Sequence, residues 1–148
     1  MSEVNIRNKK ASFEFQFLET YTAGMVLTGT EIKSVRNNKA SITEAYCYLK
    51  NNELYVKNMH IAEYEKASFY KHDPKADRKL LLTSHELNKL AKGVKNQGLT
   101  IIPLRVFLSE KGWAKIEIAL AKGKKLYDKR EDLKSKDAKR DIDRAMSH

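Results

Sequence analysis

Cysteine, proline and glycine are scarce in this chain of 148 residues. Cys47 is the only cysteine, which excludes an internal disulfide, and its apolar surroundings indicate a buried thiol in a reducing compartment. With 2 prolines and 6 glycines, the sequence contains no long flexible linker. The length allows one compact domain with an appendage and is too short for two comfortable domains.

Long apolar segments are missing as well. The N-terminal residues lack an apolar stretch of signal-peptide length, and no later segment approaches the roughly 20 apolar residues that a membrane-spanning helix needs. The basic C-terminal region also lacks the Trp or Phe face of a helix that lies on a membrane surface. We therefore expect a cytoplasmic protein without a membrane partner.

Patterns that carry catalysis or bind metals are absent too. The histidines lie far apart, and no Cys-x-x-Cys, Gly-x-Ser-x-Gly or phosphate-binding glycine loop occurs. Asp73 and Asp77 flank Pro74 and could suggest a nuclease carboxylate, but Asp-Pro more commonly begins a turn. The sequence therefore predicts no enzyme, no metal and no cofactor, and an RNA-processing enzyme is a distant alternative.

Positive charge, in contrast, is abundant. The chain has 29 Lys and Arg residues against 19 Asp and Glu residues, a formal net charge of +10, which favours an anionic partner. Exposed tyrosines among these cations would favour nucleic acid, because aromatic rings can stack on bases. We expect the basic segments to converge on one face of the fold; they are residues 7–10, 33–39, 71–79 and 122–130.

Several segments have the pattern of β-strands. From Ser12 to Glu19, phenylalanines at every second position alternate with polar residues, which predicts a half-buried strand. Residues 46–50 and 54–56 are β-prone runs on either side of Asn51-Asn52-Glu53, and Asn tolerates the positive φ of a tight hairpin turn. These runs therefore predict a β-hairpin.

A second hairpin is predicted from residues 99–108 and 113–120, which lie on either side of Ser109-Glu110-Lys111-Gly112. Pro103 cannot donate a hydrogen bond to a neighbouring strand, so it should mark an edge or a bulge. Strands that recur this often favour a β-barrel over an open α/β sheet. Further short β-prone runs are residues 24–27, 60–64 and 80–82.

Two helices are expected within this β pattern. Thr83 and Glu86 form a capping-box pattern, the residues that follow have one apolar face, and Gly98 can end the helix, so a helix is predicted over residues 83–97. A shorter helix is predicted over residues 30–37. The fold class is therefore mainly β with short helices.

The composition changes after Leu120. Residues 121–148 contain ten Lys or Arg and six Asp or Glu, with few large apolar side chains. Pairs of opposite charge three or four residues apart support a solvated helix by only a few tenths of a kcal/mol each, roughly, which is too little to fold the segment alone. We therefore predict a barrel domain over residues 1–120 and a basic tail over residues 121–148 that is disordered when free and orders on binding.

Four stretches of the sequence, taken together, resemble one family. They are Asn8-Lys9-Lys10-Ala11, Gly29-Thr30-Glu31-Ile32-Lys33-Ser34-Val35-Arg36, Arg78-Lys79-Leu80-Leu81-Leu82, and Gly123-Lys124-Lys125 with Asp128-Lys129-Arg130. In this order they resemble small protein B, the tmRNA-binding (SsrA-binding) family of bacterial trans-translation. The likeness covers nearly the whole chain and departs from the usual family pattern at Thr22, Ala76 and Tyr127.

This resemblance implies an OB-fold-like closed barrel that binds the tRNA-like domain of tmRNA and delivers it, with elongation factor Tu, to stalled ribosomes. Specificity would come from the shape of the RNA more than from its base sequence. Glu31 would orient basic neighbours rather than touch phosphate. By the same resemblance, the residues that line or support the tmRNA surface are Asn8, Lys9, Lys10, Glu31, Lys33, Arg36, Arg78, Lys79 and Leu81.

The resemblance also implies that the tail enters the empty mRNA path of the small ribosomal subunit, becomes helical there and meets ribosomal RNA near the decoding centre. An alternative from the residues alone is a general RNA-binding barrel protein of the translation apparatus, which the combination of motifs favours less. The tail residues that would contact the ribosome are Lys124, Lys125, Tyr127, Asp128, Lys129 and Arg130.

Overall fold

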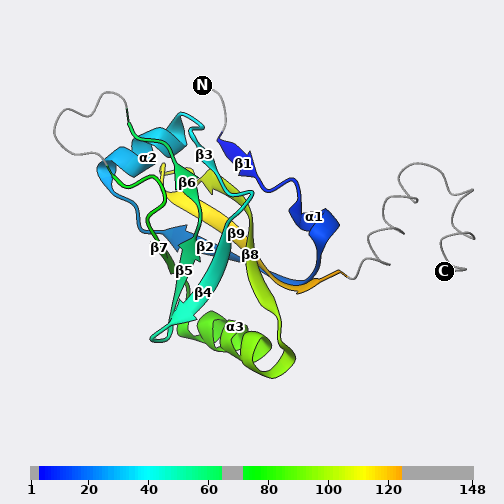
Figure 1. The fold of residues 1–148 in the computed structure, drawn as a ribbon. Coiled ribbons are helices and arrows are strands. Elements are labelled where there is room, and N and C mark those ends of the chain that lie inside the picture. Colours follow the sequence, from blue (N-terminus) through cyan, green and yellow to red (C-terminus); the bar gives the residue numbers. More distant parts are fainter. Residues whose placement is uncertain (1–3, 65–71, 125–148) are drawn as a thin grey trace, which may run out of the picture.

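Antiparallel strands connected by short helices make up the computed structural model, which describes residues 4–64 and 72–124 (Figure 1). The expectation of a mainly β fold with short helices is confirmed. Along the chain the elements are β1 (Asn5–Arg7), α1 (Ala11–Glu14), β2 (Phe15–Met25), α2 (Gly29–Arg36), β3 (Ala40–Ser41), β4 (Tyr46–Lys50), β5 (Glu53–Lys57), β6 (His60–Ile61), β7 (Arg78–Leu81), α3 (Ser84–Gln97), β8 (Thr100–Leu108) and β9 (Ala114–Gly123).

The strand pairings of the main sheet form a ring. In the order β8, β4, β5, β7, β2 and β9, each strand pairs antiparallel with the next, and β9 pairs again with β8. β1 adds to β8, and β3 and β6 form a separate two-stranded sheet. The inner face is apolar, and Leu54, Val56, Ile116 and Ile118 are fully buried there. Removal of these side chains from water is the main stabilising contribution to the fold.

Both predicted hairpins are present. Asn51 and Asn52 join β4 to β5 with positive φ angles of 53° and 61°, as a tight two-residue turn requires. β8 and β9 form the second hairpin, and their register shifts between Pro103 and Arg105, so the predicted bulge is found at the proline. The strand β9 continues to Gly123, because Ala121 is fully buried and pairs with both neighbouring strands. The sheet therefore includes the first three residues of the segment predicted as tail.

The predicted strand over residues 12–19 is wrong in its start, and its phenylalanine face is buried only in part, since Phe15 packs against a small apolar cluster that includes Ala121. Phe13 lies in the helical turn α1, and β2 begins only at Phe15. The register of β2 against β9 shifts between Phe17 and Glu19, so residues before and after Leu18 present opposite faces. Phe17 is consequently 37% exposed, and the buried side of β2 lies further along the strand.

The shorter β-prone runs are strands only in part. The first run loses its last two residues to the connection that leads into α2, which begins after the capping residue Thr28. Its first two residues, Gly24 and Met25, end β2. Of the other two runs, His60 and Ile61 form β6, and Leu80 and Leu81 end β7.

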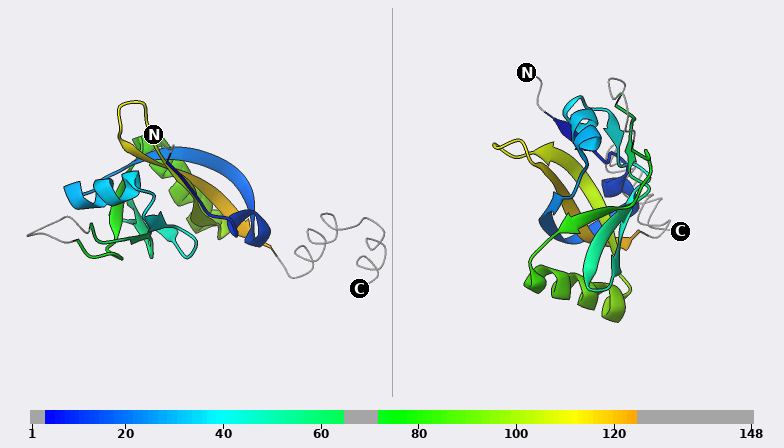
Figure 2. Two further views of the ribbon diagram at one scale, coloured as in Figure 1. Left: turned by 90° about the horizontal axis from the view of Figure 1, so that it is seen from above. Right: turned by 90° about the vertical axis from the view of Figure 1, so that its left-hand side faces the viewer.

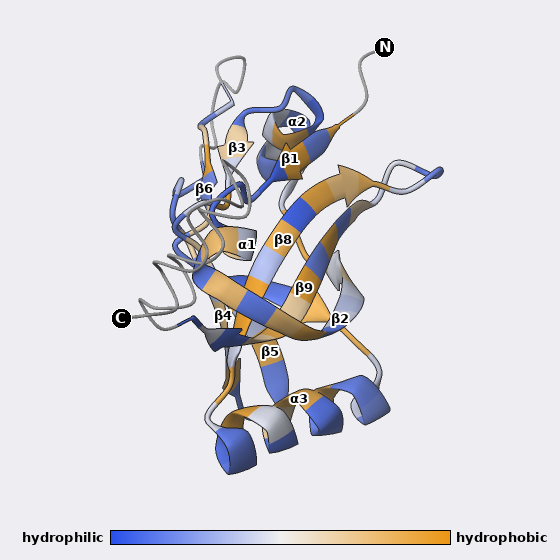
Figure 3. Cartoon of the chain, turned by 90° about the vertical axis from the view of Figure 1, so that its right-hand side faces the viewer, coloured by the Kyte–Doolittle hydropathy of each residue, from blue (hydrophilic) through white to orange (hydrophobic). Residues whose placement is uncertain are grey.

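The helices match their sequence signals. Thr83 and Glu86 form the expected capping box at the start of α3, and Gly98 ends the helix with a φ of +66°. α3 lies at the end of the sheet opposite α2 (Figure 1). Gly93 is buried against β9, where an added Cβ would clash with the side chain of Leu120. This close approach lets α3 cover one end of the apolar interior, as the hydropathy colouring of Figure 3 illustrates.

Candidate nucleic-acid interface

A buried ion pair fixes α2 to β7. Arg78 Nε lies 2.5 Å from Glu31 Oε2, and the two residues are exposed by only 3% and 4%. The guanidinium also donates to the carbonyl oxygen of Met59 at 2.6 Å and to those of Asp73 and Pro74 at 3.1 Å each. Arg78 thus ties α2, the β5–β6 connection and the loop before β7 to the sheet through charge-assisted hydrogen bonds. Both residues support the surface from inside and do not face solvent.

His72 extends this buried polar cluster. Its Nε2 lies 2.9 Å from the carbonyl oxygen of Ile61 and its Nδ1 lies 2.9 Å from Thr30 Oγ1, with the residue only 4% exposed. Because a carbonyl can only accept, Nε2 carries the proton, and in the neutral ring Nδ1 accepts from the Thr30 hydroxyl. No sequence pattern assigned a role to this histidine, so its part in holding α2 against β6 was missed.

The solvent-facing side of α2 carries the predicted cations Lys33 and Arg36. The helix buries Glu31, Ser34 and Val35 on its other side, which leaves both cationic side chains exposed. Lys33 Nζ lies 5.3 Å from the centre of the Tyr64 ring, a cation–π contact. The ammonium group lies on the exposed side of α2, where an anionic partner can reach it.

The outward face of β7 carries Lys79 and Leu81, because Arg78 and Leu80 point inward. Leu81 is 52% exposed, so its side chain is accessible to a partner on this face. Lys79 Nζ lies 2.8 Å from Glu53 Oε1, and this contact raises the pKa of the lysine and lowers the pKa of the glutamate. Both groups are therefore charged at neutral pH.

Two tyrosines that the sequence reasoning did not single out continue this outward face. Tyr48 and Tyr55 stack with ring centres 5.5 Å apart, and Tyr55 lies directly opposite Lys79 in the register of β5 and β7. The Tyr48 hydroxyl donates to Asp77 at 2.7 Å, which raises the pKa of Tyr48 to about 12. The signal was present in the predicted hairpin, since Tyr48 and Tyr55 lie directly opposite each other across its turn and so share one face.

Asn8 anchors a second predicted group at the other side of the sheet. Its backbone N–H donates to the carbonyl oxygen of Leu104 at 2.9 Å, and its side-chain Nδ2 donates to that of Pro103 at 3.0 Å. These bonds hold the exposed Lys9 and Lys10 on the outside, where Lys10 Nζ lies 3.5 Å from a Glu44 carboxylate oxygen. Within the described residues, Asn8 Oδ1 is buried and has no hydrogen-bond partner.

Lys124, at the end of the described chain, belongs to the same group. Its backbone N–H donates to the carbonyl oxygen of Glu14 at 2.9 Å, and its Nζ donates to that of Ser12 at 3.0 Å. The chain therefore leaves the sheet beside α1. The other predicted tail residues, which are Lys125, Tyr127, Asp128, Lys129 and Arg130, lie outside the described residues.

The predicted residues thus form two groups in the structure rather than one. The α2–β7 group consists of Glu31, Lys33, Arg36, Arg78, Lys79 and Leu81, and the α1 group consists of Asn8, Lys9, Lys10 and Lys124. α1 and α2 lie well apart in two perpendicular views (Figures 1 and 2). The described residues therefore lie in two separate places, and the expected convergence of all basic segments on one face stays a prediction.

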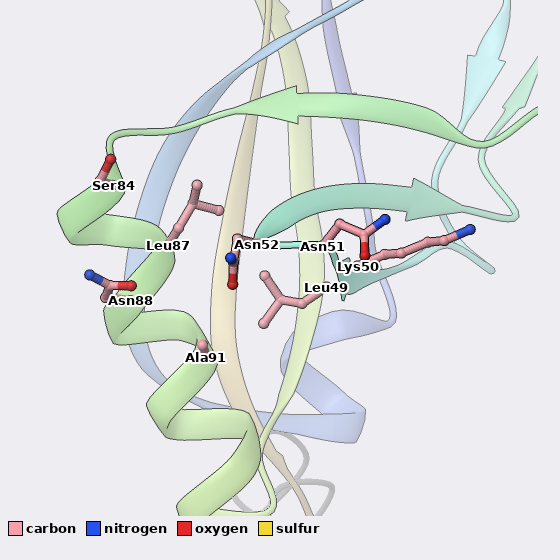
Figure 4. A pocket seen from close by; sticks show the side chains of 8 residues that line it. All are labelled: Leu49, Lys50, Asn51, Asn52, Ser84, Leu87, Asn88 and Ala91. Carbon is pink, nitrogen blue, oxygen red and sulfur yellow. The ribbon is translucent and has the colours of Figure 1, made fainter.

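A pocket of about 510 Å³ lies between α3 and the turn that joins β4 to β5 (Figure 4). Leu49, Asn52, Leu87 and Asn88 line it, and it contains none of the predicted site residues. Over residues 4–64 and 72–124, no three His, Cys, Asp or Glu side chains gather as a metal site would require. No helix in the same ranges has the length and apolar character to cross a membrane.

Comparisons with known proteins all find similarity to one family. The model of a family described as SmpB protein matches residues 5–148. The SsrA-binding protein of Cytophaga hutchinsonii is 63% identical over 144 residues, covering 97% of this chain and 94% of the relative. That of Phocaeicola vulgatus is 59% identical over 141 residues, with 95% and 94% coverage. That of Moorella thermoacetica is 47% identical over 139 residues, with 94% and 90% coverage.

A solved structure extends the similarity to three dimensions. It is described as “tmRNA-SmpB: a journey to the center of the bacterial ribosome”, and one of its chains is 42% identical to this one. The two superpose with a TM-score of 0.71, over 88% of this chain and 94% of the other. The arrangement of strands and helices described above is therefore shared with a chain of that solved structure.

Proposed function

This chain belongs to the SmpB protein family, and we propose on that basis that it binds the tRNA-like domain of tmRNA (SsrA RNA) and delivers it to stalled ribosomes for trans-translation. The observation that carries the proposal is the 63% identity, over 97% of the chain, to a protein named for SsrA binding. The predicted cations on the described surface are consistent with an RNA partner. No catalytic step is part of this proposal, and elongation factor Tu would accompany tmRNA.

The proposed RNA surface has an outer and an inner part. Lys33, Arg36 and Lys79 are the cations that would meet phosphates, and the exposed Leu81 would pack against the RNA between them. Glu31 and Arg78 would hold α2 and β7 in register beneath that surface. The ring of paired strands would act as an OB-fold-like closed barrel, a rigid support for shape recognition.

The α1 group would connect the two partners, because Asn8, Lys9 and Lys10 are proposed to meet tmRNA and Lys124 begins the proposed ribosome-binding tail. Lys124 binds back to α1 beside Lys9 and Lys10, so the chain that follows would start from a fixed point. We propose that the tail, disordered when free, enters the mRNA path of the small subunit in the cytoplasm and becomes helical near the decoding centre.

Removal of residues 125–148 tests both halves of the proposal. Truncation after Lys124 keeps β9 and its contact with α1 intact, so the body should fold as before. The truncated protein should bind labelled tmRNA with the affinity of the full chain but should not support tagging of nascent chains on stalled ribosomes. An equal loss of RNA binding and tagging would contradict the division into two surfaces.

A competition assay tests specificity. Ordinary tRNA and ribosomal RNA fragments should displace labelled tmRNA only at much higher concentration, because recognition would depend on the particular shape of its tRNA-like domain. Equal competition by these RNAs would instead support a general RNA-binding protein of the translation apparatus.

A further inference from the structure

Trp113 stands out among the described apolar side chains because it is 69% exposed. It lies at the tip of the hairpin formed by β8 and β9, just beyond Leu108 and Ala114, the last residues that pair. A large aromatic ring is rarely left in water to this extent in a folded chain. The exposed ring therefore contributes little to the stability of the fold. A contact with a partner would remove the remaining apolar surface of the ring from water.

The turn that carries Trp113 is ordered by its own hydrogen bonds. The backbone N–H of Ser109 donates to the carbonyl oxygen of Trp113 at 2.8 Å, and the Trp113 N–H donates to Ser109 Oγ at 3.1 Å. The Gly112 N–H donates to the Ser109 carbonyl oxygen at 2.9 Å, and Gly112 has a φ of +85° that other residues rarely adopt. The indole is therefore presented by a preorganised backbone, which reduces the entropic cost of binding.

A cation from α2 reaches this tip. Arg36 Nη2 donates to the carbonyl oxygen of Gly112 at 3.4 Å, although the hairpin projects away from the body (Figure 2). Lys111 is exposed at the tip as well, next to one exposed acid, Glu110. The indole thus has two cationic side chains near it against one carboxylate. This mixture of an exposed aromatic ring and flanking cations suits an unpaired nucleotide, whose base can stack while its phosphate is neutralised.

The hairpin tip also lies next to the α2–β7 group. Gly24 of β2 pairs with Lys115 of β9, so Val26 and Trp113 lie at the same end of that antiparallel ladder. The Val26 N–H donates to the carbonyl oxygen of Lys79 at 3.0 Å. One surface therefore leads from β7 past Val26 to the indole.

We propose that Trp113 is a stacking platform for an unpaired base of the bound RNA, with Arg36 and Lys111 holding the adjoining phosphates. This inference rests on the proposed function, because it presumes an RNA partner, and it adds a base contact that the predicted cations alone do not provide. The base could belong to tmRNA or to ribosomal RNA, and both present the same chemistry to the indole.

Tryptophan fluorescence can measure stacking on Trp113 directly. Trp113 is the only tryptophan, so the indole emission of the full protein reports on this residue alone. The tRNA-like domain of tmRNA and a model hairpin of the decoding centre are added separately, and binding is followed in parallel by the anisotropy of labelled RNA. At least one RNA should quench the emission as it binds and should protect the indole from acrylamide, and the RNA that does so identifies the source of the base.

Two results separate the inference from the proposed function. If tmRNA binds but neither RNA changes the indole emission, the stacking proposal is overturned and tmRNA binding still stands. Failure of tmRNA to bind at all would contradict the proposed function itself.

Variants supply the second readout. Trp113→Leu should weaken binding of the quenching RNA by about fivefold to a hundredfold, the range for loss of one base–aromatic stack. Trp113→Phe keeps a ring and should retain most of the affinity. Val94→Ala removes part of another exposed apolar side chain, in α3, and should change nothing. Equal affinity of Trp113→Leu and the parent chain, with matching thermal unfolding curves, would also overturn the proposal.

Discussion

Arg78 holds the carboxylate of Glu31 inside the protein, with Nε 2.5 Å from Oε2 and side chains exposed by 2% and 5%. Removal of either partner would leave the other charge buried and unpaired, a far larger penalty than the loss of an exposed ion pair. The pair therefore makes the position of α2 on the sheet depend on one guanidinium. The positions of Lys33 and Arg36, the exposed cations of α2, therefore depend on the same guanidinium.

Arg78→Met should lower the free energy of unfolding by about 3–5 kcal/mol, because Glu31 and the carbonyl oxygens that Arg78 satisfies would lose their donors. Urea unfolding measures the change. Arg78→Lys should recover little of it, since a lysine cannot reproduce the planar fork. Lys79→Met, at the next residue, breaks only the exposed pair with Glu53 and should leave stability nearly unchanged. Similar losses for Arg78→Met and Lys79→Met would contradict a supporting role for Arg78.

Lys33→Gln and Arg36→Gln should each weaken tmRNA binding while leaving the fold intact, because both side chains face solvent. Each lost phosphate contact should also reduce the slope of log affinity against log salt by about 1. Binding measured from about 50 to 200 mM salt gives this slope. Lys95→Gln removes an exposed cation from α3, at the opposite end of the sheet, and should act like the parent chain. A salt slope that is unchanged in both α2 variants would place the phosphates elsewhere.

Leu80 and Leu81 are neighbours in β7 with opposite surroundings, at 2% and 52% exposure. Leu80→Ala should reduce the free energy of unfolding by about 2–5 kcal/mol, as expected for a truncated core leucine. Leu81→Ala should change it by less than about 0.5 kcal/mol but should weaken tmRNA binding. Unfolding curves and RNA titrations of the two variants make the comparison. Normal RNA affinity in folded Leu81→Ala would remove Leu81 from the proposed surface.

The Tyr48 hydroxyl predicts a pH dependence. Its hydrogen bond to Asp77 raises the pKa of Tyr48 from 10.0 to about 12, so the stabilisation from this contact is complete below pH 10 and is lost as the pH rises towards 12. Tyr48→Phe should therefore lose less stability than the parent chain over this interval. Denaturant midpoints at several pH values test it, with Tyr46→Phe as the matched exposed control. Parallel curves for Tyr48→Phe and the parent would show that the contact does not form in solution.

Local sequence signals predicted those parts of the fold whose causes are local. The Asn51-Asn52 turn and the Thr83–Glu86 capping box each depend on neighbouring residues, and both were found where the sequence placed them. The bulge at Leu18 has a distant cause, because it arises from pairing with Leu120 and Ala121 of β9. A period-two pattern read along one strand cannot show where its partner shifts register.

The candidate site divides in the same way. The family motifs identified Lys33, Lys79 and Leu81, which the structure leaves facing solvent. The same motifs included Arg78 with no sign that it is interior, since its partners at Met59 and Glu31 lie 19 and 47 residues away. Trp113 carried no motif at all. The predicted second strand of the hairpin began at Trp113, whereas the β8–β9 pairing ends at Leu108 and Ala114 and leaves the indole beyond the last pair.

β9 pairs along its length with β2 on one side and β8 on the other, and the C-terminal segment follows directly from it at Gly123. A pull on that segment along the strand axis would load both ladders in shear, so many hydrogen bonds would have to break together rather than unzip in turn. The attachment point is therefore mechanically stiff, and a movement of the C-terminal end would drag the whole sheet with it instead of peeling off one strand.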